Sequence, residues 1–273
     1  MVSTIHPQAT SGFRAAGSYD LHRPSYPPSA IDDLLAAIRV KGVAKAQIVE
    51  IGAGTGKFTE LLASGAEQYR IIAGEPHAQM REILTNKGLK GTTVVADVAE
   101  RLESVEDGMM SVHVFDPTKI VYGLTRPRFA TVTTLEEIRR VLRPNGGGLG
   151  FIWNVDDFNA PIKSTPSTPY EARLKDIIRS LPNPTNQYRE LKWKECLHPS
   201  QQQLFDYPLL ERELPWTIVL SRQGIWERFA TMTQVSSLDG AELQGDDVIE
   251  DAEGNIEFHG RTVWYWTFPS SDR

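Results

Sequence analysis

Residues 48–58 read Ile-Val-Glu-Ile-Gly-Ala-Gly-Thr-Gly-Lys-Phe, and this stretch decides the fold. A short apolar run ends abruptly at Gly52, and apolar residues return at helical spacing after Gly56, so the pattern predicts a strand, a glycine turn and a helix. Gly52, Gly54 and Gly56 stand at alternate positions, which lets the backbone turn sharply. No side chain then blocks a ligand that lies against the N-terminus of the following helix.

Two further strand-then-helix units follow this segment. Residues 70–73 and 92–96 are predicted strands, and the helix between them is expected to hold Pro76 in its first turn and Met80 on its buried side. Three such units in a row predict a parallel sheet, because parallel neighbours need crossover connections and right-handed crossovers are strongly favoured. The predicted fold class is therefore α/β, with a doubly wound, mostly parallel sheet.

The rest of the chain extends the same pattern. A helix is predicted from Ser29, its expected N-cap, and another from Thr134, which is expected to form a capping box with Glu137. Further predicted strands cover residues 109–115, 149–153, 216–220 and 261–268, and further predicted helices cover residues 170–181, 200–205 and 223–234.

Composition and charge limit the class of protein. The 273 residues are 40% hydrophobic and 23% charged, which suits a chain with a sizeable core and excludes a disulfide miniprotein or a low-complexity chain. A formal net charge of -6 lacks the positive field that dominates non-specific nucleic-acid binding, so no nucleic-acid partner is expected. Cys196 is the one cysteine, and no Cys/His spacing resembles a zinc site, so neither a disulfide nor a metal is expected.

Location follows from the absence of long apolar segments in the sequence. No run of about 18 apolar residues occurs, and residues 1–20 lack the continuous apolar core of a signal peptide. We therefore expect a soluble cytoplasmic protein with a small-molecule substrate and no membrane partner. The sequence leaves the oligomeric state open.

Two other glycine-rich loops can be tested against the same segment. A phosphate-binding P-loop needs a Gly where this chain has Ile51, and a Ser or Thr where it has Phe58. The dinucleotide fingerprint G-x-G-x-x-G needs its last Gly at the position of Lys57. Both loops are disfavoured, and a nicotinamide-dependent enzyme becomes the minority interpretation.

Residues 50–56, Glu-Ile-Gly-Ala-Gly-Thr-Gly, resemble motif I of the class I S-adenosylmethionine-dependent methyltransferases. By this resemblance, Glu75 at the end of the second strand takes the place of the acid that accepts both ribose hydroxyls, and Asp97 after the third strand matches the acid beside the adenine. Each acid lies just past the carboxyl end of a strand, where open α/β sheets bind ligands. The resemblance implies S-adenosyl-L-methionine as the cofactor.

Residues 19–27, Tyr-Asp-Leu-His-Arg-Pro-Ser-Tyr-Pro, are similar to the lead-in of small-molecule methyltransferases of the ubiquinone-biosynthesis type, including trans-aconitate-methyltransferase-like proteins. In that family this piece covers the cofactor, so the resemblance implies a Rossmann-like sheet with an N-terminal helical lid and helical C-terminal additions. Tyr19 and Arg23 are implied to help close the site over the methionine carboxylate. The implied cofactor-binding residues are Tyr19, Arg23, Glu50, Gly52, Ala53, Gly54, Gly56, Glu75, Pro76, Met80, Asp97 and Val98.

The resemblance covers nearly the whole chain. It runs from about Phe13 to Asp156 and continues more faintly to the last predicted strand. We expect a single methyltransferase domain over residues 1–273, with a cofactor-binding core at 13–155 and substrate-side additions and the last strands at 156–273.

The sequence departs from the family pattern between residues 111 and 129. Family members have there an A-F-H-W-F segment near the methyl-transfer position, and two alignments are open: residues 113–117 stand for H-W-F-D-P, or residues 128–130 stand for W-F-A. The second keeps the distance to the following helix and is slightly favoured. Trp is absent in both, so the wall facing the transferred methyl differs, and His113 fits a structural role better than acid-base catalysis.

The implied function is methyl transfer to a small-molecule acceptor, and no catalytic residue is assigned. Because no general base can be placed, a carboxylic acid or another easily ionised metabolite is the favoured acceptor. Trp153 and Asn154 either shape the acceptor side or serve as a core Trp and a capping Asn. Trp226, Phe229 and Met232 either roof the pocket or pack in the core. The alternatives are a domain that binds the cofactor without methylating and a non-methylating reaction on a natural product.

Overall fold

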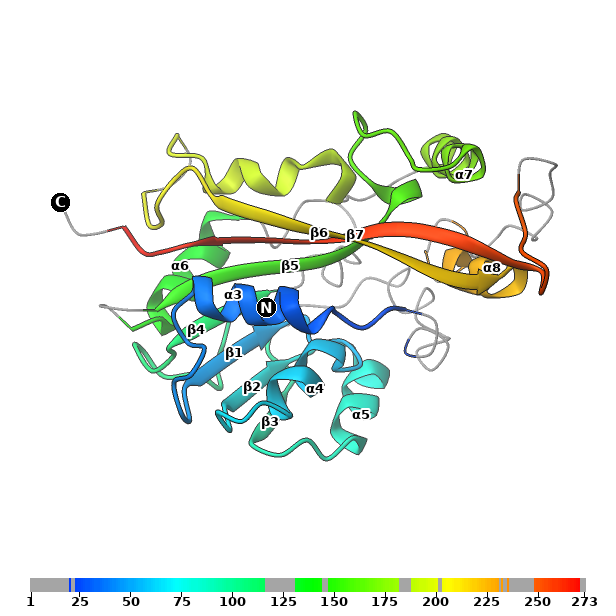
Figure 1. The fold of residues 1–273 in the computed structure, drawn as a ribbon. Helices are drawn as coiled ribbons and strands as arrows, with labels where there is room; N and C mark the ends of the chain where they lie inside the picture. The colour runs from blue at the N-terminus through cyan, green and yellow to red at the C-terminus, as the bar shows by residue number, and fades with distance from the viewer. Residues whose placement is uncertain are drawn as a thin grey trace.

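One sheet with the strand order β3-β2-β1-β4-β5-β7-β6 runs through the protein (Figure 1). The computed structural model describes residue 20 and residues 23–115, 131–143, 147–181, 188–200, 203–230, 232, 235 and 248–270. Its strands are β1 (Gln47–Ile51), β2 (Arg70–Gly74), β3 (Thr92–Val95), β4 (Val112–Phe115), β5 (Gly148–Asp156), β6 (Leu210–Ser221) and β7 (Asn255–Thr267). Its α-helices are α3 (Pro28–Ala37), α4 (Lys57–Ala63), α5 (Ala78–Asn86), α6 (Val132–Val141), α7 (Pro169–Ser180) and α8 (Arg222–Ala230).

The first five strands are parallel, and the last two complete the sheet in antiparallel pairs. β1 pairs with β2 on one side and with β4 on the other, and both pairs are parallel. β7 runs antiparallel to β5, and β6 runs antiparallel to β7. The prediction of an α/β fold with a mostly parallel sheet is confirmed. The chain passes from β1 to β2 and β3 on one side and then crosses to β4 on the other side of β1, so the strand order reverses between β1 and β4. A ligand crevice is expected between the carboxyl ends of these two strands.

Helices cover both faces of the sheet. Side chains of α3, α4 and α5 pack in one cluster with Ile48 and Ile152 of the sheet. Side chains of α6 pack on the other face with Phe151 and Trp153, which alternate with Ile152 along β5. Each face buries an apolar stripe, as the helical and strand periodicities of the sequence require.

Two predicted helix starts are wrong in detail. α3 begins at Pro28, and its N-cap residue, Pro27, has no side-chain cap, so Ser29 lies inside the first turn. The fixed φ of proline suits the first turn, which explains the earlier start. In α6 the cap is Thr131, whose Oγ1 accepts a hydrogen bond from the backbone N–H of Thr134 at 3.1 Å. Three threonines close together offered competing caps, and the first one is used.

Other boundaries also shift. Pro76 lies before the helix rather than in its first turn, because α5 begins at Ala78. The predicted helix at 200–205 is wrong for its described residues, and Phe205 instead forms a β-bridge with Pro269. A 3-10 helix, η3 (Lys192–Leu197), precedes that point instead. β6 is longer than predicted, because its first half carries charged side chains that hide the strand pattern.

We predict that Gly56→Ala destabilises the chain by about 2–4 kcal/mol, while Gly42→Ala costs about 1–2 kcal/mol. Both glycines have positive φ, +89° and +77°, but a Cβ at Gly56 would overlap Cδ1 of Leu84, and a Cβ at Gly42 meets nothing within 4 Å. Urea unfolding measures both free energies. Equal losses in the two variants would contradict the close packing of Gly56 against α5.

Candidate functional site

The glycine bend after β1 is tied to the end of β2. Gly52, Gly54 and Gly56 have φ values of 69°, 58° and 89°, which residues other than glycine rarely adopt. The backbone N–H groups of Gly52 and Ala53 donate to the carbonyl oxygen of Gly74 at 2.9 and 3.1 Å. The bend leads directly into α4, and residues 52–56 are all buried.

Glu50, the acidic residue of β1, anchors the helix that follows the bend. Its side chain is 1% exposed, and its Oε2 accepts a hydrogen bond from Oγ1 of Thr59 at 2.7 Å. Thr59 lies in the first turn of α4 and is itself buried. This bond fixes the direction in which α4 leaves the bend.

Glu75 joins the end of β2 to the centre of the glycine bend. Its Oε2 accepts from the backbone N–H of Gly54 at 2.8 Å, and its Oε1 accepts from the N–H of His77 at 2.8 Å. The Nη1 of Arg81 donates to the carbonyl oxygens of Glu75 and Pro76 at 2.8 and 2.9 Å. These bonds hold the Glu75 carboxylate between the glycine bend and the segment before α5.

His77 and Met80 complete this side of the site. Burial lowers the pKa of His77, and the charge of Arg81 lowers it further, so the imidazole is held toward its neutral form. Met80 is 1% exposed on α5, as predicted for its buried side. The structure thus brings Glu75 to the bend, and the roles of Glu75, Pro76 and Met80 toward a cofactor stay predictions.

Asp97 lies beside the end of β2 but is engaged by its own loop. Its Oδ2 accepts from the backbone N–H of Ser104 at 2.9 Å, and its Oδ1 accepts from Oγ of Ser104 at 3.1 Å. A Cβ placed on Gly74 would lie 3.5 Å from the carbonyl oxygen of Asp97, so the two strand ends are adjacent. Val98 forms a β-bridge with Arg101 in the same loop.

The lead-in before α3 contacts both α4 and the end of β5. Tyr19 lies outside the described residues, but the carboxylate of Asp20 lies 3.8 Å from Nζ of Lys57 and 3.3 Å from Nζ of Lys87. Burial raises the pKa of Asp20, but Thr55 and the two lysine charges outweigh it, and the net pKa falls below its ordinary value. Arg23 is placed elsewhere, with Nη1 at 3.9 Å from Oδ2 of Asp156.

Sequence reasoning missed the polar network at the end of β5. Asp156 is 3% exposed and accepts from Nε of Arg228 at 3.0 Å and from a second guanidinium nitrogen of that residue. Arg228 is also buried, and its guanidinium lies 5.1 Å from the ring centroids of Trp216 and Phe258. The two partners lie 72 residues apart in the chain, so no local pattern announces them.

The two residues predicted for the acceptor side have different places. Trp153 is 1% exposed and packs in the core, with its ring centroid 4.7 Å from that of Trp193. Asn154 instead donates through Nδ2 to the carbonyl oxygens of Pro24 and Ser25 at 3.3 and 3.1 Å. The core alternative is therefore confirmed for Trp153, and Asn154 holds the lead-in.

The apolar residues of α8 pack in the core. Phe229 is fully buried, with its ring centroid 5.1 Å from that of Phe158, and Met232 belongs to the same apolar cluster. Trp226 is partly buried against that cluster. Residues 116–130, which hold most of the departure segment at 111–129, and the side chain of His113 lie outside the described residues.

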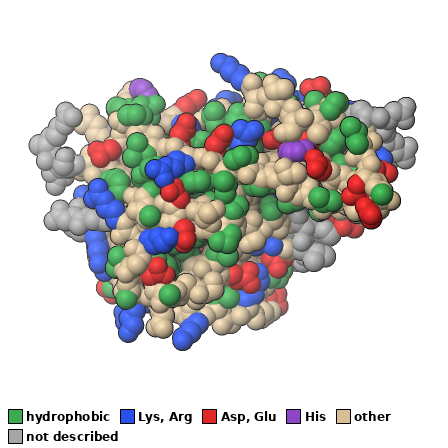
Figure 2. All heavy atoms as spheres, in the orientation of Figure 1, with side chains coloured by type: hydrophobic (Ala, Val, Ile, Leu, Met, Phe, Trp, Pro, Cys, Tyr) green, Lys and Arg blue, Asp and Glu red, His purple; other side chains and the backbone are tan. Residues whose placement is uncertain are grey.

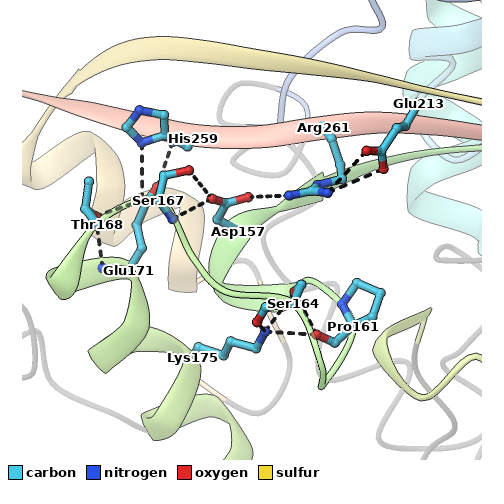
Figure 3. Close-up of polar contacts among 10 residues, drawn as sticks. All are labelled: Asp157, Pro161, Ser164, Ser167, Thr168, Glu171, Lys175, Glu213, His259 and Arg261. Carbon is cyan, nitrogen blue, oxygen red and sulfur yellow. Dashed lines mark hydrogen bonds and ion pairs between the residues drawn. The ribbon is translucent and has the colours of Figure 1, made fainter.

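A second polar cluster follows β5 and joins α7 to β7 (Figure 3). Asp157 accepts from the backbone N–H and Oγ of Ser167 at 2.9 and 2.6 Å and lies 3.5 Å from Nη2 of Arg261. Glu171 accepts from the backbone N–H of His259 at 2.7 Å and from Oγ1 of Thr168 at 2.7 Å. These bonds fix α7 against the last strand.

Glu171 is fully buried within this cluster. Burial raises its pKa, and the negative charge of Asp157 adds to the rise, while hydrogen bonds from His259 and Thr168 lower it by less. The net pKa lies above the ordinary value for a glutamate. Its Oε2 also lies 3.2 Å from Nδ1 of His259.

The described surface charges and helices do not point to one class of binding partner. On the face drawn in Figure 2, Lys and Arg side chains are interspersed with Asp and Glu side chains. Among the residues that the structure describes, no group of three or more His, Cys, Asp or Glu side chains could hold a metal ion. None of the described helices is long and apolar enough to cross a lipid bilayer.

Residues 48–146, which carry the glycine bend and both acids, match the family model described as a methyltransferase domain. The uncharacterized methyltransferase Rv3342 of Mycobacterium tuberculosis is 33% identical over 150 residues, covering 52% of this chain and 51% of the relative. The uncharacterized methyltransferase C25B8.09 of Schizosaccharomyces pombe is 32% identical over 146 residues, covering 52% of each chain. The chain thus spans about half the length of the curated relatives it matches.

The solved structure of the YcgJ protein from Bacillus subtilis has a similar fold. It superimposes with a TM-score of 0.52 at 14% sequence identity and covers 88% of this chain and 98% of that chain. This likeness concerns the fold alone, and it confirms the predicted Rossmann-like architecture.

We predict that Glu171→Gln gains stability relative to the wild type as the pH rises. Because the folded chain raises the pKa of Glu171 above 4.5, its contribution to the free energy of unfolding is fully present below that pH and is lost as the pH rises through the folded pKa. The Gln side chain has no proton to lose, so the difference between variant and wild type should grow as the pH rises above about 4.5.

Urea unfolding across this pH range measures the difference. Glu257→Gln is the matched control, because Glu257 also faces His259 but is 74% exposed. A variant that loses stability relative to the wild type as the pH rises would contradict the raised pKa.

Proposed function

Residues 48–146 form a class I S-adenosylmethionine-dependent methyltransferase domain, and from this premise we propose that the chain transfers the methyl group of the cofactor to a small-molecule acceptor. The observation that carries the proposal is the hydrogen bond from the Gly54 N–H to the Glu75 carboxylate. It brings the acid at the end of β2 to the centre of the glycine bend, at the crevice where an open α/β sheet binds ligands.

The residues present fit this cofactor. The three glycines of the bend present backbone rather than side chains toward the N-terminus of α4, which suits the amino-acid end of the cofactor. Glu75 lies at the centre of the bend, on the side expected for the ribose hydroxyls, and Asp97 lies at the neighbouring strand end for the adenine side. When bound, the cofactor supplies an electrophilic methyl group on a sulfonium, so the protein contributes mainly proximity and orientation.

We propose an acceptor that is already ionised at neutral pH, such as a carboxylic acid. Within the part of the chain that the structure describes, three acids near the strand ends already accept hydrogen bonds: Glu75 from backbone donors, Asp97 from Ser104 and Asp156 from Arg228. A carboxylate acceptor needs no general base, because it is a nucleophile without losing a proton. This argument supports the small-acid class without naming one acid.

The function is tested by calorimetry with S-adenosylmethionine and S-adenosylhomocysteine, together with a methyl-release assay on a panel of small carboxylic acids. Methylated product with stoichiometric S-adenosylhomocysteine supports the proposal. Tight binding without turnover across the panel favours a domain that binds but does not methylate. Product formed without S-adenosylhomocysteine favours a non-methylating reaction. Protection against unfolding by NADH, with none by S-adenosylmethionine, would support a nicotinamide-dependent enzyme.

We predict that Glu75→Ala weakens S-adenosylhomocysteine binding by about 10- to 100-fold, because hydrogen bonds to a charged group are worth about 1.5–3 kcal/mol. Glu75→Gln keeps the size of the side chain and one acceptor oxygen, so its loss should be smaller. Calorimetry measures both affinities. Wild-type affinity in the Ala variant would overturn the placement of the ribose.

We also predict that Gly54→Val abolishes measurable cofactor binding, because a branched side chain would stand where the backbone must approach the ligand. Gly88→Val is the matched control: Gly88 has the same φ of 58°, and a Cβ there meets nothing within 4 Å. The control separates backbone strain from obstruction of the site. Equal affinities in the two variants would contradict a ligand over the bend.

A further inference from the structure

The chain before α3 contacts elements on both sides of the crevice. We call Asp20 and residues 23–26 the strap; it leads into α3, which is drawn in blue in Figure 1. At one end Asp20 pairs with Lys57, the first residue of α4, and with Lys87 after α5. Three residues later Arg23 lies beside Asp156, the last residue of β5.

The sheet order decides what the strap crosses. α4 follows β1, and β4 lies between β1 and β5, so a segment that joins α4 to the end of β5 passes the carboxyl ends of β1 and β4. The strap therefore lies across the point where the strand order reverses, which is where ligands bind.

Asn154 holds the middle of the strap. Its Nδ2 donates to the carbonyl oxygens of Pro24 and Ser25 at 3.3 and 3.1 Å. Its Oδ1 accepts from Oγ1 of Thr262 on β7 at 2.6 Å, and Thr262 is fully buried. The Oδ1 atom of Asn154 is thus held by the sheet, and its Nδ2 group faces the strap.

Tyr26 fixes the end of the strap that leads into α3. It is 6% exposed, and its ring packs edge to face on Phe58 of α4, with centroids 5.6 Å apart. The strap consequently meets β5 at Asn154 and α4 at Phe58. The hydrogen bonds of Asn154 and the ion pair between Arg23 and Asp156 hold the strap against the end of β5.

We propose that Asn154 is a positioning residue for cofactor binding, which acts by holding the strap over the crevice through the carbonyls of Pro24 and Ser25. The inference rests on the proposed function. A carboxylate in place of the amide keeps the size of the side chain and the bond from Thr262, but it has no N–H for the strap. Asn154→Asp is therefore the variant that isolates the donor.

Three variants test the proposal: Asn154→Asp, Asn154→Ala and the control Asn159→Ala. Asn154 lies within β5 and Asn159 lies just after it, but Oδ1 of Asn159 accepts from Nη1 of Arg189 at 3.1 Å. Hydrogen exchange of the peptide that covers residues 23–35 reports on the strap. Calorimetry with S-adenosylhomocysteine and steady-state kinetics report on the cofactor.

We expect both Asn154 variants to exchange faster in residues 23–35 and to bind S-adenosylhomocysteine about 10-fold more weakly, which equals about 1.4 kcal/mol. The KM for the cofactor should rise by about the same factor while kcat changes by less than about 2-fold, a split that general destabilisation would not produce. The Asn159 variant should match the wild type in exchange, affinity and KM.

The outcomes separate this inference from the proposed function. Unchanged affinity and KM in Asn154→Asp would overturn the positioning role, whether or not exchange becomes faster. A wild-type chain that binds neither S-adenosylmethionine nor S-adenosylhomocysteine would overturn the proposed function itself. Equal losses in Asn154→Ala and Asn159→Ala would assign the effect to stability and would also overturn the inference.

Discussion

The hydrogen bond from the Gly54 amide to the Glu75 carboxylate is the contact on which the candidate site depends. The amide points toward β2 because the bend holds Gly54 at a φ of 58°, and the acid is within reach because β1 and β2 are parallel neighbours whose carboxyl ends coincide. Neither condition suffices alone. A bend without the neighbouring acid would leave a buried N–H without this acceptor, and the acid without the bend would lose its partner across the strand ends.

This contact also explains why sequence reasoning located half of the site. The glycine bend and Glu75 belong to consecutive strand-then-helix units, and parallel pairing sets their separation once the strands are recognised. Local patterns failed where the partner is distant. Asp156 and Arg228 lie 72 residues apart, and Arg228 sits in a helix whose visible signal is apolar. The threonines before α6 failed differently, since Thr131 and Thr134 both suit a cap and only packing chooses between them.

β7, one of the two long strands at the end of the sheet, positions the remaining polar contacts near the site. β7 pairs with β5 from Leu149 to Asp156, so Thr262 reaches Asn154, and the same strand continues past β5 to place His259 against Glu171. One strand therefore connects the amide that holds the strap with the helix that follows β5. A shift in register by one residue would turn both contacts to the opposite face.

The burial of Asp156 together with Arg228 raises the question of whether this ion pair stabilises the fold. Burying a carboxylate and a guanidinium together costs several kcal/mol per ion, and the attraction between them often no more than offsets that cost. The pair is therefore better understood as fixing α8 against the end of β5 than as a source of stability. Arg23 adds a second cation at 3.9 Å from the same carboxylate. Because one buried anion faces both α8 and the strap, movement of either element changes the electrostatic environment of the other.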